Sequence, residues 1–165
     1  MFGGIAPPLN ASVSRHVSEV LSSYAAVTDV LTPVLHNLPG KVIGIDGGNG
    51  TGKTTLGRYL AWHFNVTLIE SDLFADDVLS GTYRLDEIRR LIRLRLEKPR
   101  PVIVEGICLL RLLRDLAVPA NVLVYCKSRH HGESDTLGNL LARYEQEFFP
   151  ESRAAVIANN EWCDG

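Results

Sequence analysis

A glycine-rich run that ends in one lysine and two threonines has the clearest capacity for chemistry in this sequence. It satisfies the pattern G-x-x-x-x-G-K-[ST] between Gly47 and Thr54. Glycines permit positive φ angles and let backbone N–H groups turn inward around phosphate oxygens. The run therefore predicts a loop that binds the phosphates of a nucleoside triphosphate. The loop residues expected to contact the nucleotide are Gly47, Gly48, Asn49, Gly50, Thr51, Gly52, Lys53, Thr54 and Thr55.

Two side chains of this loop have predicted roles with ATP and Mg²⁺. Lys53 would reach the β- and γ-phosphates as a mobile point charge, and the hydroxyl of Thr54 would ligate Mg²⁺. The alternative is a glycine-rich turn in an unrelated domain. Sequence context favours the phosphate loop, because an apolar strand precedes it and a helix-compatible segment follows it.

The elements around the loop alternate between short apolar runs and helical periodicity. The expected strands cover residues 41–46, 66–70, 102–105, 121–126 and 154–158, and the expected helices cover 54–64, 83–96, 109–116 and 137–148. Continuous apolar strands that alternate with helices are typical of a parallel sheet covered on both faces. The sequence therefore predicts an α/β fold with three layers and a five-stranded parallel sheet.

The first 40 residues are expected to form a unit of their own. Residues 1–12 resemble a loose arm, and a helix is predicted from Ser12 or Ser14 to about Leu31, where Thr32-Pro33 would end it. We expect this amphipathic helix to pack on the core, although it could instead dock a partner or pair two copies in a homodimer. The domain that carries the glycine-rich loop is then predicted to cover residues 41–165.

Composition narrows the class of partner. The chain has 165 residues and a formal net charge of −2, which gives no whole-protein attraction to nucleic acid or to an anionic membrane. No apolar run approaches the roughly 18 residues of a membrane span. The three cysteines are widely spaced, so reduced thiols in a cytoplasmic protein are expected.

Three acidic residues follow or end predicted strands and are candidates for the chemistry. Asp46 directly precedes the loop, Asp72 follows the second strand and Glu105 closes the third. The carboxyl ends of parallel strands open onto the ligand cleft, so all three should lie beside the phosphates. Asp46 could shape the loop or face the substrate, Asp72 could be a base or a cap, and Glu105 could bind Mg²⁺ or substrate or bond backbone amides.

Three segments together resemble the uridine kinase/phosphoribulokinase-like P-loop kinases. They are Gly44 to Thr55, Glu70 to Phe74 and Val102 to Ile107. The resemblance implies a five-stranded parallel P-loop fold with strand order 2-3-1-4-5 and transfer of the ATP γ-phosphate to a hydroxyl of a small metabolite, such as a nucleoside or sugar. It also implies that Asp72 orients and deprotonates the acceptor hydroxyl. Switch GTPases are disfavoured, because no N-K-x-D motif is present.

The sequence departs from the family after the fourth strand. The family carries an arginine-rich lid there, and Arg129 is the best available lid cation. Tyr83 and Arg84, near the start of a helix, are candidate acceptor contacts. The basic residues late in that helix suit its macrodipole and favour a solvated face. The sparse lid leaves open a second hypothesis, a nucleotide-binding regulatory protein derived from such a kinase.

Overall fold

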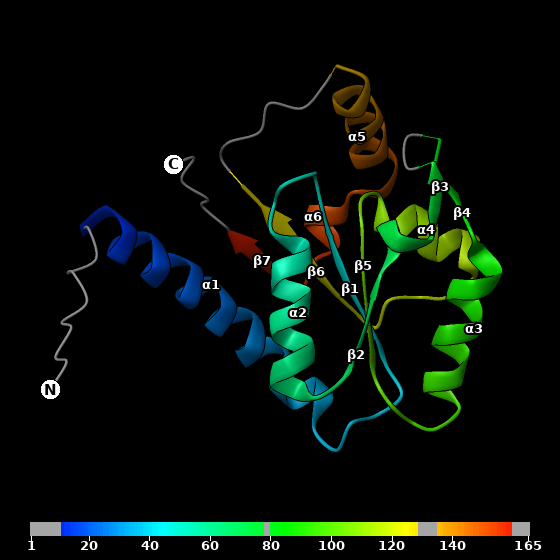
Figure 1. Ribbon diagram of the computed structural model, residues 1–165, viewed down its shortest axis with the longest axis horizontal. Helices are drawn as coiled ribbons and strands as arrows, with labels where there is room; N and C mark the ends of the chain where they lie inside the picture. Colours follow the sequence, from blue (N-terminus) through cyan, green and yellow to red (C-terminus); the bar gives the residue numbers. More distant parts are fainter. Residues whose placement is uncertain (1–10, 78–79, 129–134, 160–165) are drawn as a thin grey trace, which may run out of the picture.

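The computed structural model describes residues 11–77, 80–128 and 135–159, and its centre is a five-stranded parallel sheet (Figure 1). The strands are β1 (Val42–Gly47), β2 (Thr67–Glu70), β5 (Val102–Glu105), β6 (Val122–Lys127) and β7 (Val156–Asn159). Their order across the sheet is β2-β5-β1-β6-β7. Counted among themselves along the chain, these strands have the order 2-3-1-4-5, so the predicted topology is confirmed.

Helices cover both faces of this sheet and complete the three predicted layers. They are α1 (Ala11–Leu35), α2 (Lys53–Phe64), α3 (Leu85–Leu96), α4 (Leu109–Leu116), α5 (Asp135–Phe148) and the single turn α6 (Pro150–Arg153). One buried cluster joins α1 and α2 to the sheet, and a second joins α3, α4 and α5 to its other face. Within the described ranges, no helix is both long enough and apolar enough to cross a membrane.

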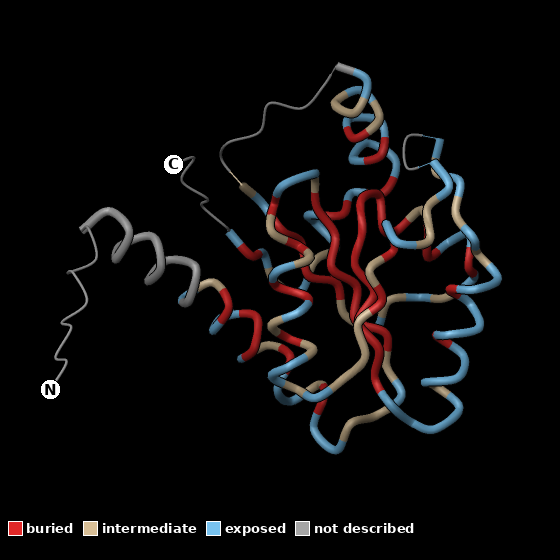
Figure 2. Tube along the Cα trace, in the orientation of Figure 1, coloured by how far each residue is buried: buried red, intermediate tan, exposed pale blue. Residues whose placement is uncertain are grey.

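The central strands are buried along their whole length, as Figure 2 shows by their colour. β1 lies between β5 and β6, with Ile43 beside Ile103 and Ile45 beside Val124. Neighbouring side chains on a strand point to opposite faces, so a strand covered on both faces is apolar over most of its length. This requirement explains the continuous apolar runs that marked these strands in the sequence. Asp46 and Glu105 are the exceptions, at the carboxyl ends of β1 and β5.

The first helix does not end at Thr32-Pro33 as predicted but continues to Leu35. Proline lacks an N–H and disfavours a helix interior, but Leu31 and Leu35 are both buried in the core. Their burial holds the last turn in helical form across Pro33. From Tyr24 onward the helix packs against the core, and its main contacts are with β7 and α2.

A small antiparallel hairpin beyond β2 was not predicted. A 3₁₀ turn (Ser71–Phe74) leads from β2 into β3 (Ala75–Asp77), which pairs with β4 (Thr82–Tyr83). The predicted helix start at Tyr83 is wrong, because Tyr83 belongs to β4 and α3 begins at Leu85. The strands are too short to show an alternating pattern, so the sequence carried no periodic signal for them.

Candidate functional site

The glycine-rich loop joins the carboxyl end of β1 to the first residue of α2. Gly47 has a φ of +146°, and a Cβ built on it would overlap the carbonyl oxygen of Cys126 on the neighbouring strand. Gly52, which precedes α2, has a φ of +80°. Side chains at these positions would be strained, so the loop shape depends on glycine. An N-terminal helix turn reached by such a loop is suited to bind phosphate groups.

Lys53 is folded onto the loop that it follows. Its side chain is buried, and Nζ donates a hydrogen bond to the carbonyl oxygen of Gly48 at 2.6 Å. The hydroxyl of Thr51 donates to the same oxygen at 2.9 Å. The ammonium group therefore lies within the loop, where a bound phosphate would meet it.

Thr54 and Glu105 meet at the site where Mg²⁺ was expected. The Thr54 hydroxyl donates to Oε1 of Glu105 at 3.1 Å, and the other oxygen, Oε2, is buried without a hydrogen-bond partner among the described residues. Burial raises the pKa of Glu105, while the positive charge of Lys53 opposes this rise. A buried carboxylate oxygen without a partner, next to a hydroxyl, offers the hard oxygen ligands that Mg²⁺ prefers. The residues present therefore fit the metal.

Asp46 is fully buried, and both of its carboxylate oxygens are engaged. Oδ1 accepts hydrogen bonds from the N–H groups of Gly47 at 2.7 Å and Leu109 at 3.4 Å, and Oδ2 accepts one from the hydroxyl of Tyr144. Burial raises the pKa of Asp46 to about 6. The arrangement favours the first of the two sequence hypotheses, in which Asp46 fixes the shape of the loop.

Asp72 lies in the 3₁₀ turn after β2 and is exposed. In the described part of the chain its carboxylate makes no ion pair and caps no helix. A Cβ on Gly106 would overlap the hydroxyl of Ser71, so the turn after β5 packs directly on this 3₁₀ turn. After burial, the negative charge of Asp72 also raises the pKa of Glu105.

The two acceptor candidates differ in their surroundings. Arg84 is engaged on several sides: it donates to the carbonyl oxygen of Leu73 at 2.6 Å, lies 3.4 Å from Glu87 and stacks over Phe74. These contacts hold the 3₁₀ turn and α3 together. Tyr83 is half-buried, and burial followed by the charge of Asp72 raises the pKa of its hydroxyl to about 12.

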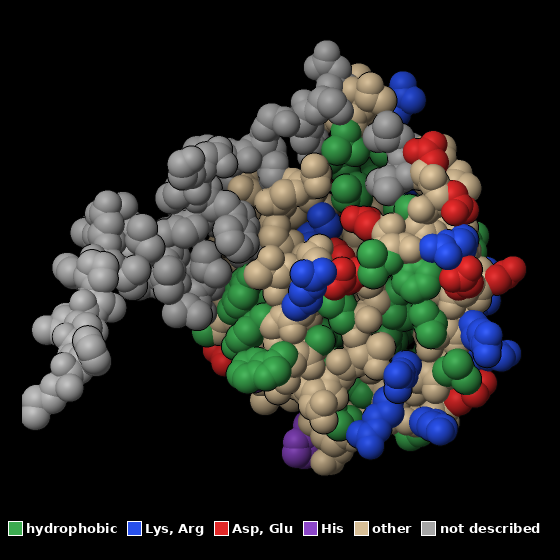
Figure 3. Space-filling model, in the orientation of Figure 1, with side chains coloured by type: hydrophobic (Ala, Val, Ile, Leu, Met, Phe, Trp, Pro, Cys, Tyr) green, Lys and Arg blue, Asp and Glu red, His purple; other side chains and the backbone are tan. Residues whose placement is uncertain are grey.

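The predicted lid cation Arg129 lies outside the described residues. Lys127, just before it, forms an ion pair with Glu151. On α3, Arg89 pairs with Asp86 at 2.6 Å and Arg93 pairs with Glu97 at 3.3 Å. Figure 3 shows acidic and basic side chains interspersed over this part of the surface, as expected of the predicted solvated face.

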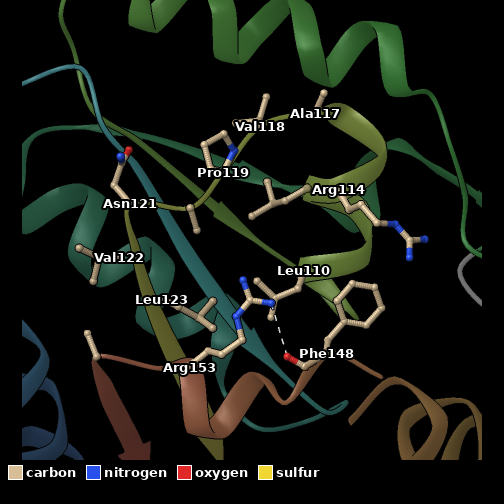
Figure 4. Close-up of a pocket in the computed structure, with 13 residues that line it drawn as sticks. Leu110, Arg114, Ala117, Val118, Pro119, Asn121, Val122, Leu123, Phe148 and Arg153 are labelled. Atoms are coloured by element: carbon tan, nitrogen blue, oxygen red, sulfur yellow. Dashed lines mark hydrogen bonds between the residues drawn. The ribbon is translucent and has the colours of Figure 1, made fainter. Parts of the chain in front are cut away.

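A separate cavity of about 540 Å³ lies between α4, the start of β6 and α6 (Figure 4). It sits at the amino end of β6, whereas the phosphate loop follows the carboxyl end of β1. Its two charged lining residues are already in use: Arg114 pairs with Asp115 and Glu147, and Arg153 donates to the carbonyl oxygen of Phe148. The lining offers no carboxylate for acid or base chemistry, so the candidate site is the one around the loop.

Comparison with known proteins supports the fold assignment. No model of a known protein family matches the chain. A curated dephospho-CoA kinase from Nostoc sp. is 43% identical over 51 residues, which are 30% of this chain and 26% of that protein. The chain therefore matches about a quarter of the length of this relative.

Two solved structures share the fold at low sequence identity. A structure described as a possible uridine kinase from Bacillus stearothermophilus has a TM-score of 0.56 and 14% identity, and the match covers 80% of this chain and 98% of that chain. A sugar kinase from Janibacter sp. HTCC2649 has a TM-score of 0.52 and 14% identity over 74% of this chain and 86% of that chain. The chain thus has the fold of P-loop kinases, as its sequence resemblance implied.

Proposed function

We propose that this protein is a phosphotransferase that moves the γ-phosphoryl group of ATP to a hydroxyl group of a small metabolite. The observation that carries the proposal is the pairing of Thr54 with Glu105, whose second oxygen is buried beside the phosphate loop and has no partner among the described residues. A carboxylate next to the threonine of the loop would hold Mg²⁺, which phosphoryl transfer requires.

Each residue of the site then has a defined task. The loop amides and Lys53 hold the phosphates, and Thr54 and Glu105 would hold Mg²⁺ directly or through water. When bound, Mg²⁺ would neutralise charge that develops on the phosphate oxygens. Asp72 accepts the proton of the acceptor hydroxyl while the oxygen of that hydroxyl forms a bond to the γ-phosphorus. The bond from that phosphorus to the β–γ bridging oxygen breaks, and ADP leaves.

The relatives support a kinase without identifying the acceptor. The proteins that match by sequence or by fold are named as dephospho-CoA, uridine and sugar kinases. Their acceptors differ, and the similarity to the solved structures extends to the fold alone. Nucleosides, sugars, hydroxy acids and sugar phosphates therefore all belong in a test panel.

The direct test is transfer of labelled γ-phosphate from ATP, with Mg²⁺, to members of that panel. Asp72→Asn should lower the turnover by at least about 100-fold, because general base catalysis contributes on that order. Its affinity for a non-hydrolysable ATP analogue should stay unchanged. Asp76→Asn is a matched control, since Asp76 is an exposed carboxylate in the adjoining hairpin, 3.9 Å from Arg84.

Two outcomes would contradict the proposal. Full turnover in Asp72→Asn would remove Asp72 as the base. Tight binding of ATP and Mg²⁺ without transfer to any acceptor class would favour the nucleotide-binding regulatory protein instead.

A further inference from the structure

An arginine that the sequence did not single out lies in the first turn of α4, on the same edge of the sheet as the phosphate loop. Arg111 follows β5 by six residues, so the turn that ends β5 at Glu105 carries it to this edge. Its side chain is half-buried. In the part of the chain that the structure describes, its guanidinium group forms no ion pair and no hydrogen bond. A half-buried guanidinium loses hydration and is stabilised when an anion replaces the lost water.

The guanidinium of Arg111 lies against the backbone of the hairpin beyond β2. Gly81, in the turn before β4, has a φ of +72°, and a Cβ built on it would overlap Nη2 of Arg111 and contact its Cζ. The guanidinium therefore lies close to backbone that carries no side chain at this point. Only the fold brings these two residues together, because they lie 30 positions apart in the sequence.

Tyr83 connects Arg111 to the proposed catalytic base. Both the carboxylate of Asp72 and the guanidinium of Arg111 act on the Tyr83 hydroxyl, the first raising its pKa and the second lowering it. Tyr83 in turn pairs with Ala75, which follows directly after the 3₁₀ turn that holds Asp72. Asp72 and Arg111 thus lie beside the same hairpin, Asp72 in the turn that leads into β3 and Arg111 against Gly81, just before β4.

Two neighbouring arginines are already occupied. Arg84 is held by the carbonyl oxygen of Leu73, by Glu87 and by the Phe74 ring, and Arg114 is held by Asp115 and Glu147. Arg111 differs from them because it has no charged partner among the described residues.

We propose that Arg111 binds an anionic group of the phosphate acceptor, so that the acceptor class is hydroxyl compounds that also carry a carboxylate or a phosphate. This inference rests on the proposed transfer to a hydroxyl. Asp72 acts on the hydroxyl, and Arg111 holds the anionic end of the same molecule. A planar fork with parallel N–H donors suits both oxyanions, which makes Arg111 a specificity-determining residue.

Anion binding can be measured without turnover. The full chain is first saturated with Mg²⁺ and a non-hydrolysable ATP analogue, so that the phosphate loop is occupied. Inorganic phosphate and malonate are then titrated separately by calorimetry, and the tighter ligand distinguishes a phosphate site from a carboxylate site. Arg111→Met should weaken binding of the tighter ligand by at least about tenfold, the effect expected for a hydrogen bond to a charged group. Arg111→Lys keeps the positive charge but loses the planar fork of donors, so its affinity for the anion should lie between those of Arg111→Met and the wild type.

The control is Arg90→Met, which removes an exposed arginine of α3 that likewise makes no ion pair in the described structure. It should bind both anions like the wild type. The affinity of each variant for the ATP analogue and its melting temperature show that the site is otherwise intact. The inference would be overturned if the wild type bound neither anion, or if Arg111→Met bound them as tightly as the wild type does.

Kinetics with matched acceptors separate this inference from the proposed function. For an acceptor that carries the anionic group, Arg111→Met should raise KM at least about tenfold, while kcat/KM for its neutral counterpart stays the same. Transfer that is indifferent to the anionic group would overturn the role of Arg111 and leave the kinase intact. If Arg111→Met loses anion binding but the wild type transfers phosphate to no acceptor, the role of Arg111 as an anion site stands and the proposed kinase activity is overturned.

Discussion

The hydroxyl of Tyr144 on α5 donates a hydrogen bond to the buried carboxylate of Asp46, the residue directly before the phosphate loop. The same hydroxyl accepts a hydrogen bond from the N–H of Leu110 at 3.0 Å. Asp46 also accepts hydrogen bonds from the N–H groups of Gly47 and Leu109. The base of the loop, the start of α4 and the middle of α5 are therefore joined through two side chains. This pair therefore connects α5, which follows the segment in which a lid was predicted, to the phosphate site.

The contribution of Asp46 to stability should depend on pH. Burial raises its pKa from an ordinary value of 3.8 to about 6, so the folded protein holds more protons than the unfolded chain between these values. This contribution is present in full below about pH 4 and is lost as the pH rises through about 6. Urea unfolding of the wild type and of Asp46→Asn from pH 4.5 to pH 7.5 measures it.

The free energy of unfolding of the wild type minus that of Asp46→Asn should fall across this range. The variant cannot ionise at this position, so it provides the pH dependence of all other groups. A difference that stays constant or grows with pH would show that Asp46 is ionised in the folded protein throughout.

Gly47→Ala should destabilise the fold and weaken nucleotide binding. The added Cβ would overlap the carbonyl oxygen of Cys126, and the φ of +146° is unfavourable for alanine. We expect a loss of about 1–3 kcal/mol in the free energy of unfolding, typical of such backbone strain. Thermal or urea unfolding measures it. Gly40→Ala is the control, because the nearest atoms to its added Cβ lie at 3.4 Å, an ordinary contact distance. Equal effects of the two substitutions would argue against a special shape at Gly47.

Lys53→Met should weaken binding of the ATP analogue by about 10- to 100-fold, because one charge-assisted hydrogen bond contributes about 1.5–3 kcal/mol. The methionine retains most of the buried aliphatic stem, so the fold should persist. Calorimetric titration with the analogue and Mg²⁺ measures the change. Lys41→Met removes a lysine next to the amino end of β1, at the opposite edge of the sheet, and should bind as the wild type does. An unchanged affinity in Lys53→Met would place the phosphates elsewhere.

The sequence predicted those parts of the fold whose signal is local. The strands of the main sheet are buried on both faces, so their apolar runs marked them, and the loop pattern located the turn between Gly47 and Lys53. The strand order came from the resemblance to a kinase family, because periodicity alone does not order strands. Glu105 could be placed beside the loop because the carboxyl ends of parallel strands share one edge, and it contacts Thr54 there.

The remaining features depend on contacts between distant segments. The β3–β4 hairpin is too short to leave a pattern, and the extension of α1 past Pro33 depends on the burial of Leu35. The partners of Asp46 and the setting of Arg111 come from elements that lie far away in the chain. A tyrosine within a helical pattern is ordinarily a core residue, so nothing in the sequence marked Tyr144 as the partner of a buried carboxylate.

Glu105→Gln should raise the Mg²⁺ concentration required for tight binding of the ATP analogue. The neutral amide keeps the size of the side chain and can still accept the hydrogen bond from Thr54, but it removes the negative charge that favours a divalent cation.

Glu70→Gln is a demanding control, because Glu70 lies beside Glu105 in the neighbouring strand. Both carboxylate oxygens of Glu70 are already held by Arg58, at 2.7 and 2.9 Å. The Mg²⁺ concentration required at a fixed concentration of analogue should therefore rise at least about tenfold in Glu105→Gln and little in Glu70→Gln. Of these two residues, only Glu105 has a carboxylate oxygen without a hydrogen-bond partner among the described residues. Equal shifts would mean that the general negative potential of this edge, rather than the carboxylate beside Thr54, attracts the metal.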